Sequence, residues 1–227
     1  MERLSEELSK QLWLVFGRSL NIIQKNPQLV VTAVRIVERE ERADACAIQR
    51  QAESGFLPPD RPKRWKARAF KVLSDAVMER IEGNQFEERI DNKMWLVRHL
   101  EVTRLLMIKD LRVVKTLCAP CFPPHWDIVN QFIAKYHRNL SKHLEDIIAA
   151  GLDGNEFITL LSWVLQTYPG PELLQHPHAN IDPNSLSSLL NEDTVEKLCN
   201  VIRNHSSFII CTDLYYFYCF LFFLGLS

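Results

Sequence analysis

The stretch DNKMWLVRHLEVTRLLMIKDLRVVKTL, residues 91–117, predicts the strongest helix of the chain. Its apolar positions recur in steps of three and four residues, which places them on one side of a helix. They are Leu96, Leu100, Thr103, Met107, Leu111 and Val114. Neither glycine nor proline interrupts the stretch, and Asp91 or Asn92 is expected to cap its start, because a short side-chain oxygen can accept from a free backbone N–H. The other predicted helices need this apolar stripe to bury their own.

Apolar periodicity predicts further helices along most of the chain. Their expected ranges are 3–24, 27–52, 62–82, 125–150, 155–168 and 185–203. Proline-rich segments at 54–62 and 118–124 predict loops, because proline lacks an N–H and favours extended backbone before it. The half of the second helix that contains Glu38 and Arg42 is expected to be a solvated face, with these two residues paired at a spacing of four. No strand is expected before the C-terminal tail, so the fold class is all-α.

Composition limits the classes of function. With 227 residues and 47% hydrophobic content, the chain is long enough for one large helical domain or two small ones. Its 27 basic and 28 acidic residues give a net charge of -1, so nucleic acid or an acidic membrane exerts no general attraction and any such binding is local. The sequence has neither a G-x-x-x-x-G-K-[ST] nor a G-x-G-x-x-G pattern, which argues against a nucleotide-binding α/β enzyme.

The two ends of the chain differ in character. The N-terminus is charged and has no apolar core, and the six cysteines are scattered, so we expect a cytosolic protein with reduced thiols and no signal peptide. Residues 208–226 are nearly continuously apolar, with eight aromatics and one charge, Asp213. This length just reaches the roughly 20 residues that span a bilayer. We expect a poorly packed terminus there, with a tail anchor and a tail buried in the domain as the alternatives.

Several segments together match, in order and spacing, the exocyst complex component 3 family, which includes the component 3-like paralogues and M-Sec. They are VVTAVRIVEREER at 30–42, GFLPPDRPKRWK at 55–66, RIEGNQ at 80–85, NKMWLVRHLEVTR at 92–104, CFPPHWDI at 121–128, YHRNL at 136–140 and LLSWVLQTYPGPELL at 160–174. The resemblance covers residues 12–203, nearly the whole chain. KMWLVRHLE and CFPPH are long enough to make chance a poor explanation.

The resemblance implies an elongated stack of antiparallel helical bundles, as in multisubunit tethering complexes. It implies a non-enzymatic scaffold that attaches secretory vesicles to the plasma membrane before fusion, located in the cytoplasm and peripherally on the plasma membrane or vesicles. The implied partners are exocyst subunits, SNARE proteins, small GTPases of the Ral or Rab type and phosphoinositide-rich membrane, without nucleic acid or cofactor. The similarity to M-Sec adds an alternative, a phosphoinositide-binding module that remodels membranes.

Family members are much longer than this chain. The chain is therefore expected to be an internal piece without the N-terminal coiled-coil region and the C-terminal bundles. Residues 1–203 are expected to form the family-like helical region, and 204–227 a divergent apolar tail.

A basic segment lies at the start of the helix predicted after the proline-rich loop, and it is the candidate site for acidic lipid headgroups. Its members, with Trp65 among them, are Arg61, Lys63, Arg64, Lys66, Arg68 and Lys71. Clusters of four to eight basic residues on an amphipathic helix bind anionic leaflets with about 1 kcal/mol per residue. The alternative is a solvated face paired with acidic residues of a neighbouring helix. Cations at a helix N-terminus oppose the helix dipole, which favours the lipid site.

The spacing Cys118-x-x-Cys121-x-x-x-His125 places three residues of zinc-ligand type close together in the sequence. A fourth ligand is missing nearby, and Pro120, Pro123 and Pro124 favour a structural turn with buried cysteines. We therefore predict no metal site.

No catalytic set is apparent either. His99 has no nucleophile and orienting acid proposed around it, and His176 and His178 lie in a turn-rich loop, so an enzyme is not expected. The large aromatic residues in or beside the apolar stripes are expected to anchor the core: Trp95, Trp126, Trp163 and Tyr168.

Overall fold

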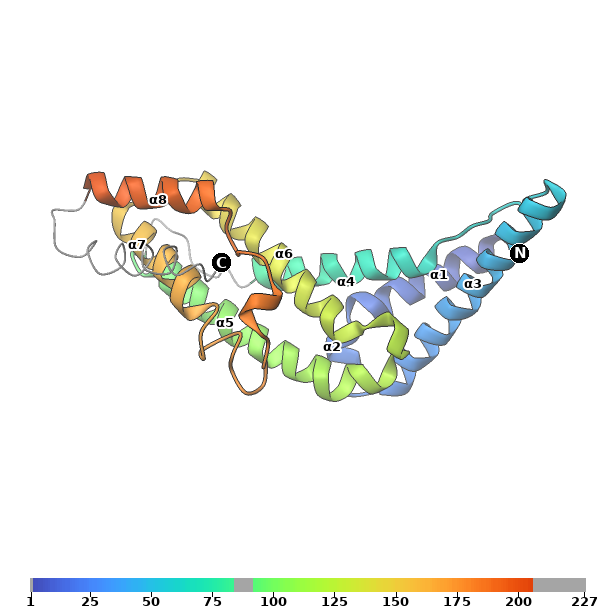
Figure 1. The fold of residues 1–227 in the computed structure, drawn as a ribbon. Coiled ribbons are helices and arrows are strands. Elements are labelled where there is room, and N and C mark those ends of the chain that lie inside the picture. Colours follow the sequence, from blue (N-terminus) through green and yellow to red (C-terminus); the bar gives the residue numbers. More distant parts are fainter. Residues whose placement is uncertain (1, 84–91, 206–227) are drawn as a thin grey trace. The chain divides into compact units, whose positions relative to one another are not determined.

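The computed structural model describes residues 2–83 and 92–205 (Figure 1), and within these ranges it contains helices and no strand. The fold is therefore all-α, as predicted. The α-helices are α1 (Glu2–Gly17), α2 (Ser19–Ile22), α3 (Pro27–Ser54), α4 (Trp65–Glu82), α5 (Trp95–Val113), α6 (Ile128–Ala149), α7 (Gly154–Ser162) and α8 (Glu192–His205). Shorter turns of π type are η1 (Val114–Cys118) and η4 (Trp163–Thr167), and those of 3-10 type are η2 (Ala119–Cys121), η3 (Pro124–Trp126) and η5 (Pro183–Ser185).

The chain divides into two compact units. The first unit contains residues 1–79 and 113–135, and the second contains residues 80–112 and 136–227. Each unit is thus assembled from two separate stretches of sequence. Both have an apolar core of their own, described in turn below.

Aromatic side chains form the core of the first unit. Trp13 of α1 packs edge-on against Trp65 of α4, with ring centroids 5.7 Å apart and an interplanar angle of 79°. Phe16 stacks on Trp126, and Phe70 and Phe122 contact the same indole. Trp126 is 1% exposed, so it is the centre of this cluster, and the prediction that it anchors the core is confirmed.

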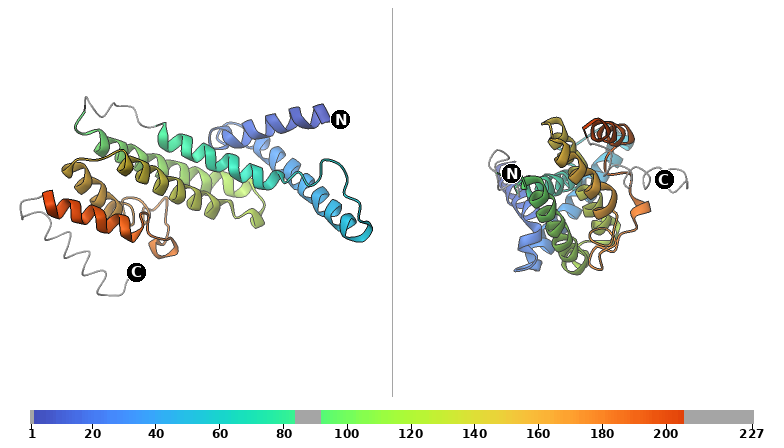
Figure 2. Two further views of the ribbon diagram at one scale, coloured as in Figure 1. Left: turned by 90° about the horizontal axis from the view of Figure 1, so that it is seen from above. Right: turned by 90° about the vertical axis from the view of Figure 1, so that its left-hand side faces the viewer.

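The core of the second unit is built on α5 and α6. His99 contacts His143, and Asp110 contacts Tyr136, so the two helices run antiparallel in this unit. The predicted stripe is confirmed, since all six of its residues are buried, five in this unit and Val114 in the first. Figure 2 shows α8 returning beside α7, and the two helices are in contact. Trp95, Trp163 and Tyr168 are buried in this unit, as expected.

Several helices begin later than the apolar pattern predicts. The helix expected from residue 62 begins at Trp65, because Arg64 has a left-handed backbone with φ of 55° that no α-helix accommodates. The helix expected from residue 185 begins at Glu192, where the Asn191 side chain accepts from Thr194 N–H at 2.7 Å. Before it, the Asp182 side chain caps the short turn η5.

The helix predicted over residues 91–117 begins, as α5, at Trp95, four residues after the start of that stretch. The Asn92 side chain accepts from Met94 N–H at 2.8 Å, so Asn92 contributes to the start of the helix as expected. Asp91 lies outside the described residues. The last turn of the predicted helix has π geometry, and α4 ends at Glu82, the predicted end point.

Within residues 2–83 and 92–205, no helix has both the length and the apolar content that crossing a bilayer requires. The apolar segment 208–226, for which a tail anchor was an alternative, lies outside the described residues.

Candidate functional site

The basic segment 61–71 is held in the first unit by a buried carboxylate on α3. Asp44 is 6% exposed and accepts from Arg61 Nη1 at 2.5 Å, from Lys63 N–H at 3.0 Å and from Arg64 N–H at 2.8 Å. Burial alone would raise the pKa of Asp44. The hydrogen bonds from the Arg61 side chain and from the two backbone N–H groups outweigh burial, so this pKa lies below its usual value. Asp44 therefore holds the segment as an ionised carboxylate.

Two further acidic residues of α3 pair with the same segment. Glu40 Oε2 lies 2.9 Å from Arg61 Nη2 and 3.1 Å from Lys63 Nζ, and Glu41 Oε2 lies 3.7 Å from Lys66 Nζ. The expectation of a solvated face on this half of α3 is therefore wrong for Glu40 and Asp44. The predicted side-chain pair between Glu38 and Arg42 is also replaced. Arg42 Nε instead donates to the backbone carbonyl of Glu38 at 3.4 Å.

Three of the basic side chains lie over indole rings. Lys63 Nζ is 4.8 Å from the Trp65 ring centroid, and Lys66 Nζ is 5.5 Å from that of Trp126. The guanidinium of Arg68 lies 4.8 Å above Trp13. Such contacts contribute about 0.5–1 kcal/mol at exposed sites. The tryptophans thus orient the cations, and the buried ring of Trp65 belongs to the core.

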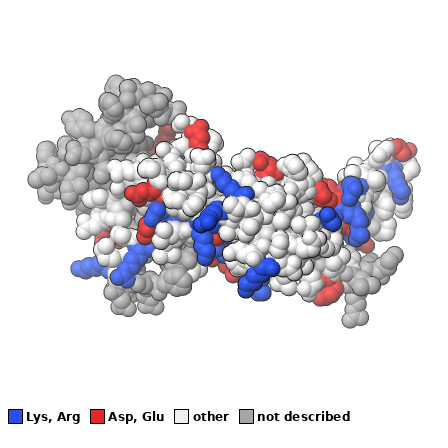
Figure 3. Space-filling view, turned by 90° about the horizontal axis from the view of Figure 1, so that it is seen from below, with Lys and Arg blue, Asp and Glu red and all other residues white. Residues whose placement is uncertain are grey.

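The six members of the segment divide into two groups. Arg61, Lys63 and Lys66 are half-buried and pair with acidic residues of α3, as the paired-face alternative predicts for them. The exposed members are Arg64, Arg68 and Lys71. On the face drawn in Figure 3, Lys and Arg are spread over several places with acidic side chains among them. A lipid site on this chain therefore depends on the local group of exposed cations.

The structure does not assemble the zinc-type residues into a metal site. Cys118 is buried, and burial raises the pKa of the half-buried Cys121 thiol, which disfavours the thiolate that zinc binds. His125 is exposed, and its Nε2 lies 3.3 Å from Glu38 Oε1. In the part of the chain that the structure describes, no group of three His, Cys, Asp or Glu side chains is placed to hold a metal ion.

Buried and half-buried histidines make polar side-chain contacts inside the second unit. His99 Nε2 lies 2.8 Å from His143 Nε2, and both rings are buried. His137 joins two segments, with Nδ1 2.8 Å from the Tyr168 hydroxyl and Nε2 3.1 Å from Ser187 Oγ. Burial lowers the pKa of His137 and of His143, so both favour the neutral ring. His176 and His178 lie in the loop where the sequence places them.

A comparison with known protein families identifies the family of this chain. The family model described as "Exocyst complex component Sec6" matches residues 1–205. The chain belongs to this exocyst family. The match includes every described element, from α1 to α8, and confirms the resemblance found in the sequence.

Relatives of the exocyst family include proteins from distant animals. The chain is 48% identical over 199 residues to "Exocyst complex component 3" of Drosophila melanogaster, a match that covers 87% of this chain and 27% of that protein. It is 37% identical over 204 residues to the protein of the same name from Caenorhabditis elegans, covering 86% and 25%. It is 32% identical over 204 residues to "Exocyst complex component 3-like protein" of Danio rerio, covering 87% and 26%.

The chain thus spans about a quarter of the length of these exocyst relatives. No solved structure matches it.

Sequence reasoning missed the residues that organise the exocyst chain's polar sites. Asp44 was predicted on a solvated face, and His137 and Ser187 were not singled out. The placement of Asp between alanines in ADACA, on a helix whose apolar stripe includes Val37 and Ala47, was the available indication that Asp44 is buried. His137 and Ser187 are fifty residues apart, and no local pattern joins them.

Proposed function

We propose that this chain is a non-enzymatic helical scaffold of an exocyst subunit that contributes to tethering secretory vesicles at the plasma membrane and to regulated exocytosis. The observation that carries the proposal is the family match over residues 1–205, on a chain whose described part is helical throughout its regular structure. The Drosophila melanogaster relative is named as a component of the exocyst. The proposed location is cytoplasmic and peripheral to the plasma membrane or vesicles.

The proposed mechanism is presentation of docking faces by packed helices. Each unit has its own aromatic or aliphatic core, which holds exposed residues at fixed spacing. Several modest contacts then add through effective concentration when partners are linked in one complex. Other exocyst subunits are the first proposed partners, followed by SNARE proteins and small GTPases of the Ral or Rab type.

Affinity purification from secretory cells tests the scaffold. The full chain and a version that ends at residue 205 are tagged, and exocyst subunits, SNARE proteins and chaperones are quantified against the tag alone. Enrichment of exocyst subunits by both versions supports the scaffold and makes the tail dispensable. Recovery of chaperones without exocyst subunits contradicts it.

The exposed cations of the basic segment favour a second function, binding of phosphoinositide-rich membrane. Arg64, Arg68 and Lys71 are exposed on or next to the first turns of α4, while the other three members of the segment are anchored to α3. Lipid binding by Arg61, Lys63 and Lys66 requires that an anionic headgroup share or displace their acidic partners. Membrane remodelling, as proposed for the M-Sec-like alternative, requires this binding first.

Liposome binding tests the second function. At about 1 kcal/mol per basic residue near an anionic leaflet, Arg64→Glu with Arg68→Glu removes at least about 2 kcal/mol, which lowers partitioning roughly 30-fold. Lys93→Glu with Lys109→Glu is the matched control, because both residues are exposed cations outside the segment. Equal binding by the wild type and the Arg64/Arg68 variant excludes the segment as a lipid site.

A further inference from the structure

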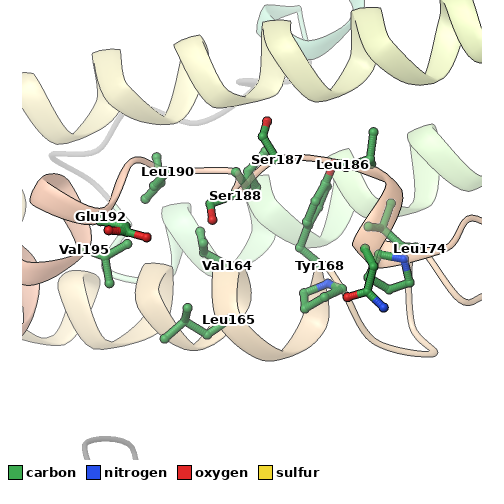
Figure 4. Close-up of a pocket in the computed structure, with 14 residues that line it drawn as sticks. Val164, Leu165, Tyr168, Leu174, Leu186, Ser187, Ser188, Leu190, Glu192 and Val195 are labelled. Atoms are coloured by element: carbon green, nitrogen blue, oxygen red, sulfur yellow. The ribbon is translucent and has the colours of Figure 1, made fainter. Parts of the chain in front are cut away.

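The second unit contains a pocket between the helix formed by α7 and η4 and the segment that precedes α8 (Figure 4). Its volume is about 560 Å³, within the range of sites that bury small ligands or several side chains. Aliphatic side chains form half of its lining. They are Val164, Leu165, Leu174, Leu186, Leu189, Leu190 and Val195.

Hydrogen bonds hold the wall in place on both sides. The Tyr168 hydroxyl and Ser187 Oγ are both tied to His137, so the segment before α8 is attached to α6. Leu174 N–H donates to Tyr168 O at 3.1 Å, and Ile181 N–H donates to Leu174 O at 2.8 Å. A wall fixed in this way is preorganised, and a ligand does not have to order it on binding.

One charged side chain lines the pocket. It is the exposed carboxylate of Glu192, in the first turn of α8. No Lys or Arg is among the 14 described residues that line the pocket. An apolar wall with one carboxylate beside it attracts an apolar group that carries a positive charge next to it and disfavours anions.

We propose that this pocket is a docking site for a peptide segment of a partner protein that inserts a large apolar side chain and places a Lys or Arg beside Glu192. The Glu192 carboxylate favours a basic segment and disfavours phosphate-bearing lipids and nucleic acids. Ser187, Ser188 and Asn184 add polar groups to the lining, which can bond the peptide main chain. The inference goes beyond the scaffold function, because it assigns a site and the chemistry of its ligand.

Selection of short random peptides on the full chain tests the site. The peptides selected are expected to carry an aliphatic or aromatic residue within a few positions of Lys or Arg. Their binding is then measured against two variants, Ser188→Trp and Glu192→Lys. Ser188 is exposed and lies beside Val164 in Figure 4, so a tryptophan there fills the pocket without entering the core.

The expected results separate the two features of the site. Ser188→Trp is expected to weaken binding of the selected peptides at least about tenfold, and Glu192→Lys about tenfold, with a smaller effect at high salt. The matched controls, Ala149→Trp and Glu145→Lys, change exposed residues of α6 outside the pocket and are expected to leave binding unchanged.

Three results of the peptide selection overturn the proposal. They are failure to select any peptide, selected peptides that bind Ser188→Trp as well as the wild type, and selected peptides without basic residues. A concentration-dependent dimer that Ser188→Trp abolishes also overturns it, because the occupant is then a second copy of this chain. These readouts measure peptide binding or self-association alone, so they do not depend on vesicle tethering.

Discussion

Arg80 and Asp110 form a bidentate ion pair inside the second unit. Arg80 Nε lies 2.6 Å from Asp110 Oδ2, and Nη2 lies 2.7 Å from Oδ1. The Tyr136 hydroxyl donates to the same Oδ2, and Asp110 is 2% exposed. Burial and the adjacent Asp110 raise the pKa of Tyr136 well above its usual value, so the hydroxyl keeps its proton at physiological pH. One carboxylate thus connects α4, α5 and α6 within this unit.

Removal of this carboxylate is expected to destabilise the second unit strongly. Asp110→Ala removes the buried carboxylate that pairs with Arg80, and breaking a buried pair in this way costs about 3–5 kcal/mol. Tyr136→Phe removes one hydrogen bond and is expected to cost about 1–2 kcal/mol. Urea unfolding followed by circular dichroism measures both.

Replacement of the whole group is the control for this prediction. Arg80→Met with Asp110→Leu and Tyr136→Phe removes both charges and the hydroxyl that donates to Asp110, and such replacements of buried pairs are often neutral or stabilising. A triple variant as unstable as Asp110→Ala would show that the cost of Asp110→Ala does not come from breaking the ion pair.

Asp44 is expected to stabilise the first unit in a pH-dependent way. Because its pKa is lower in the folded state, its contribution is present above the unfolded value of about 3.9 and is lost as the pH falls through the folded pKa. Asp44→Asn is expected to cost about 2 kcal/mol at neutral pH, since hydrogen bonds to charged groups contribute about 1.5–3 kcal/mol each. It is also expected to flatten the loss of stability on acidification.

Urea midpoints between about pH 5 and about pH 2 measure this dependence. Glu53→Gln, an exposed carboxylate near the end of the same helix, is the control and keeps the wild-type profile. If Asp44→Asn and the wild type lose the same amount of stability as the pH falls, protonation of Asp44 is not the cause of that loss. Faster proteolysis after Lys63 in Asp44→Asn is a second expected result, because the three donors from Arg61, Lys63 and Arg64 are then left with one amide oxygen.

His143 is expected to make the second unit less stable at mildly acidic pH. Burial lowers its folded-state pKa, although Glu82 and Asp146 act in the opposite direction, and His99 is its hydrogen-bonded neighbour. As the pH falls from the unfolded value of about 6.5 toward the folded pKa, the unfolded state binds the proton first. Stability then decreases by at most about 1.4 kcal/mol per pH unit for this group.

Comparison of urea unfolding at about pH 7.5 and about pH 5.5 tests this prediction. His143→Gln is expected to reduce the difference between the two conditions, whereas His178→Gln, at an exposed loop position, is expected to leave it unchanged. If His143→Gln shows the same difference in stability between the two pH values as the wild type, another group takes up the proton.

The sequence was sufficient to predict what depends on local periodicity. The stripe from Leu96 to Val114 is buried as expected, because a helix with apolar residues every three or four positions has only one face to bury. The predicted starts of α4 and α8 were wrong, since local apolar periodicity does not determine where these helices begin. Arg64 adopts its left-handed backbone next to Asp44, which is 20 residues earlier, and no window around Arg64 contains that carboxylate.

The sequence predicted which residues make up the basic segment, but not which of them are exposed. The basic residues from Arg61 to Lys71 are evident in the sequence, but their division into anchored and exposed groups depends on Glu40 and Asp44. The same holds for the pocket, whose polar contacts join His137 to Tyr168 and Ser187 across 31 and 50 residues.

Glu156 is expected to couple the start of α7 to α5. Its Oε1 accepts from Trp95 Nε1–H at 2.5 Å, and its Oε2 accepts from Asp153 N–H at 2.8 Å in a capping box. Glu156→Ala removes both acceptors, and we expect a loss of about 2–3 kcal/mol in the free energy of unfolding. Glu156→Gln keeps the carbonyl oxygen for Trp95, so its expected loss is about 1 kcal/mol.

Two further variants isolate the interhelical part of this effect. Asp153→Ala removes the cap and leaves the Trp95 contact, so it is expected to cost about 1 kcal/mol. Glu145→Ala, on the exposed face of α6, is expected to change the free energy of unfolding by less than about 0.5 kcal/mol. If Glu156→Ala and Asp153→Ala prove equally stable in urea, the bond to Trp95 contributes nothing, because the cap then accounts for the whole loss.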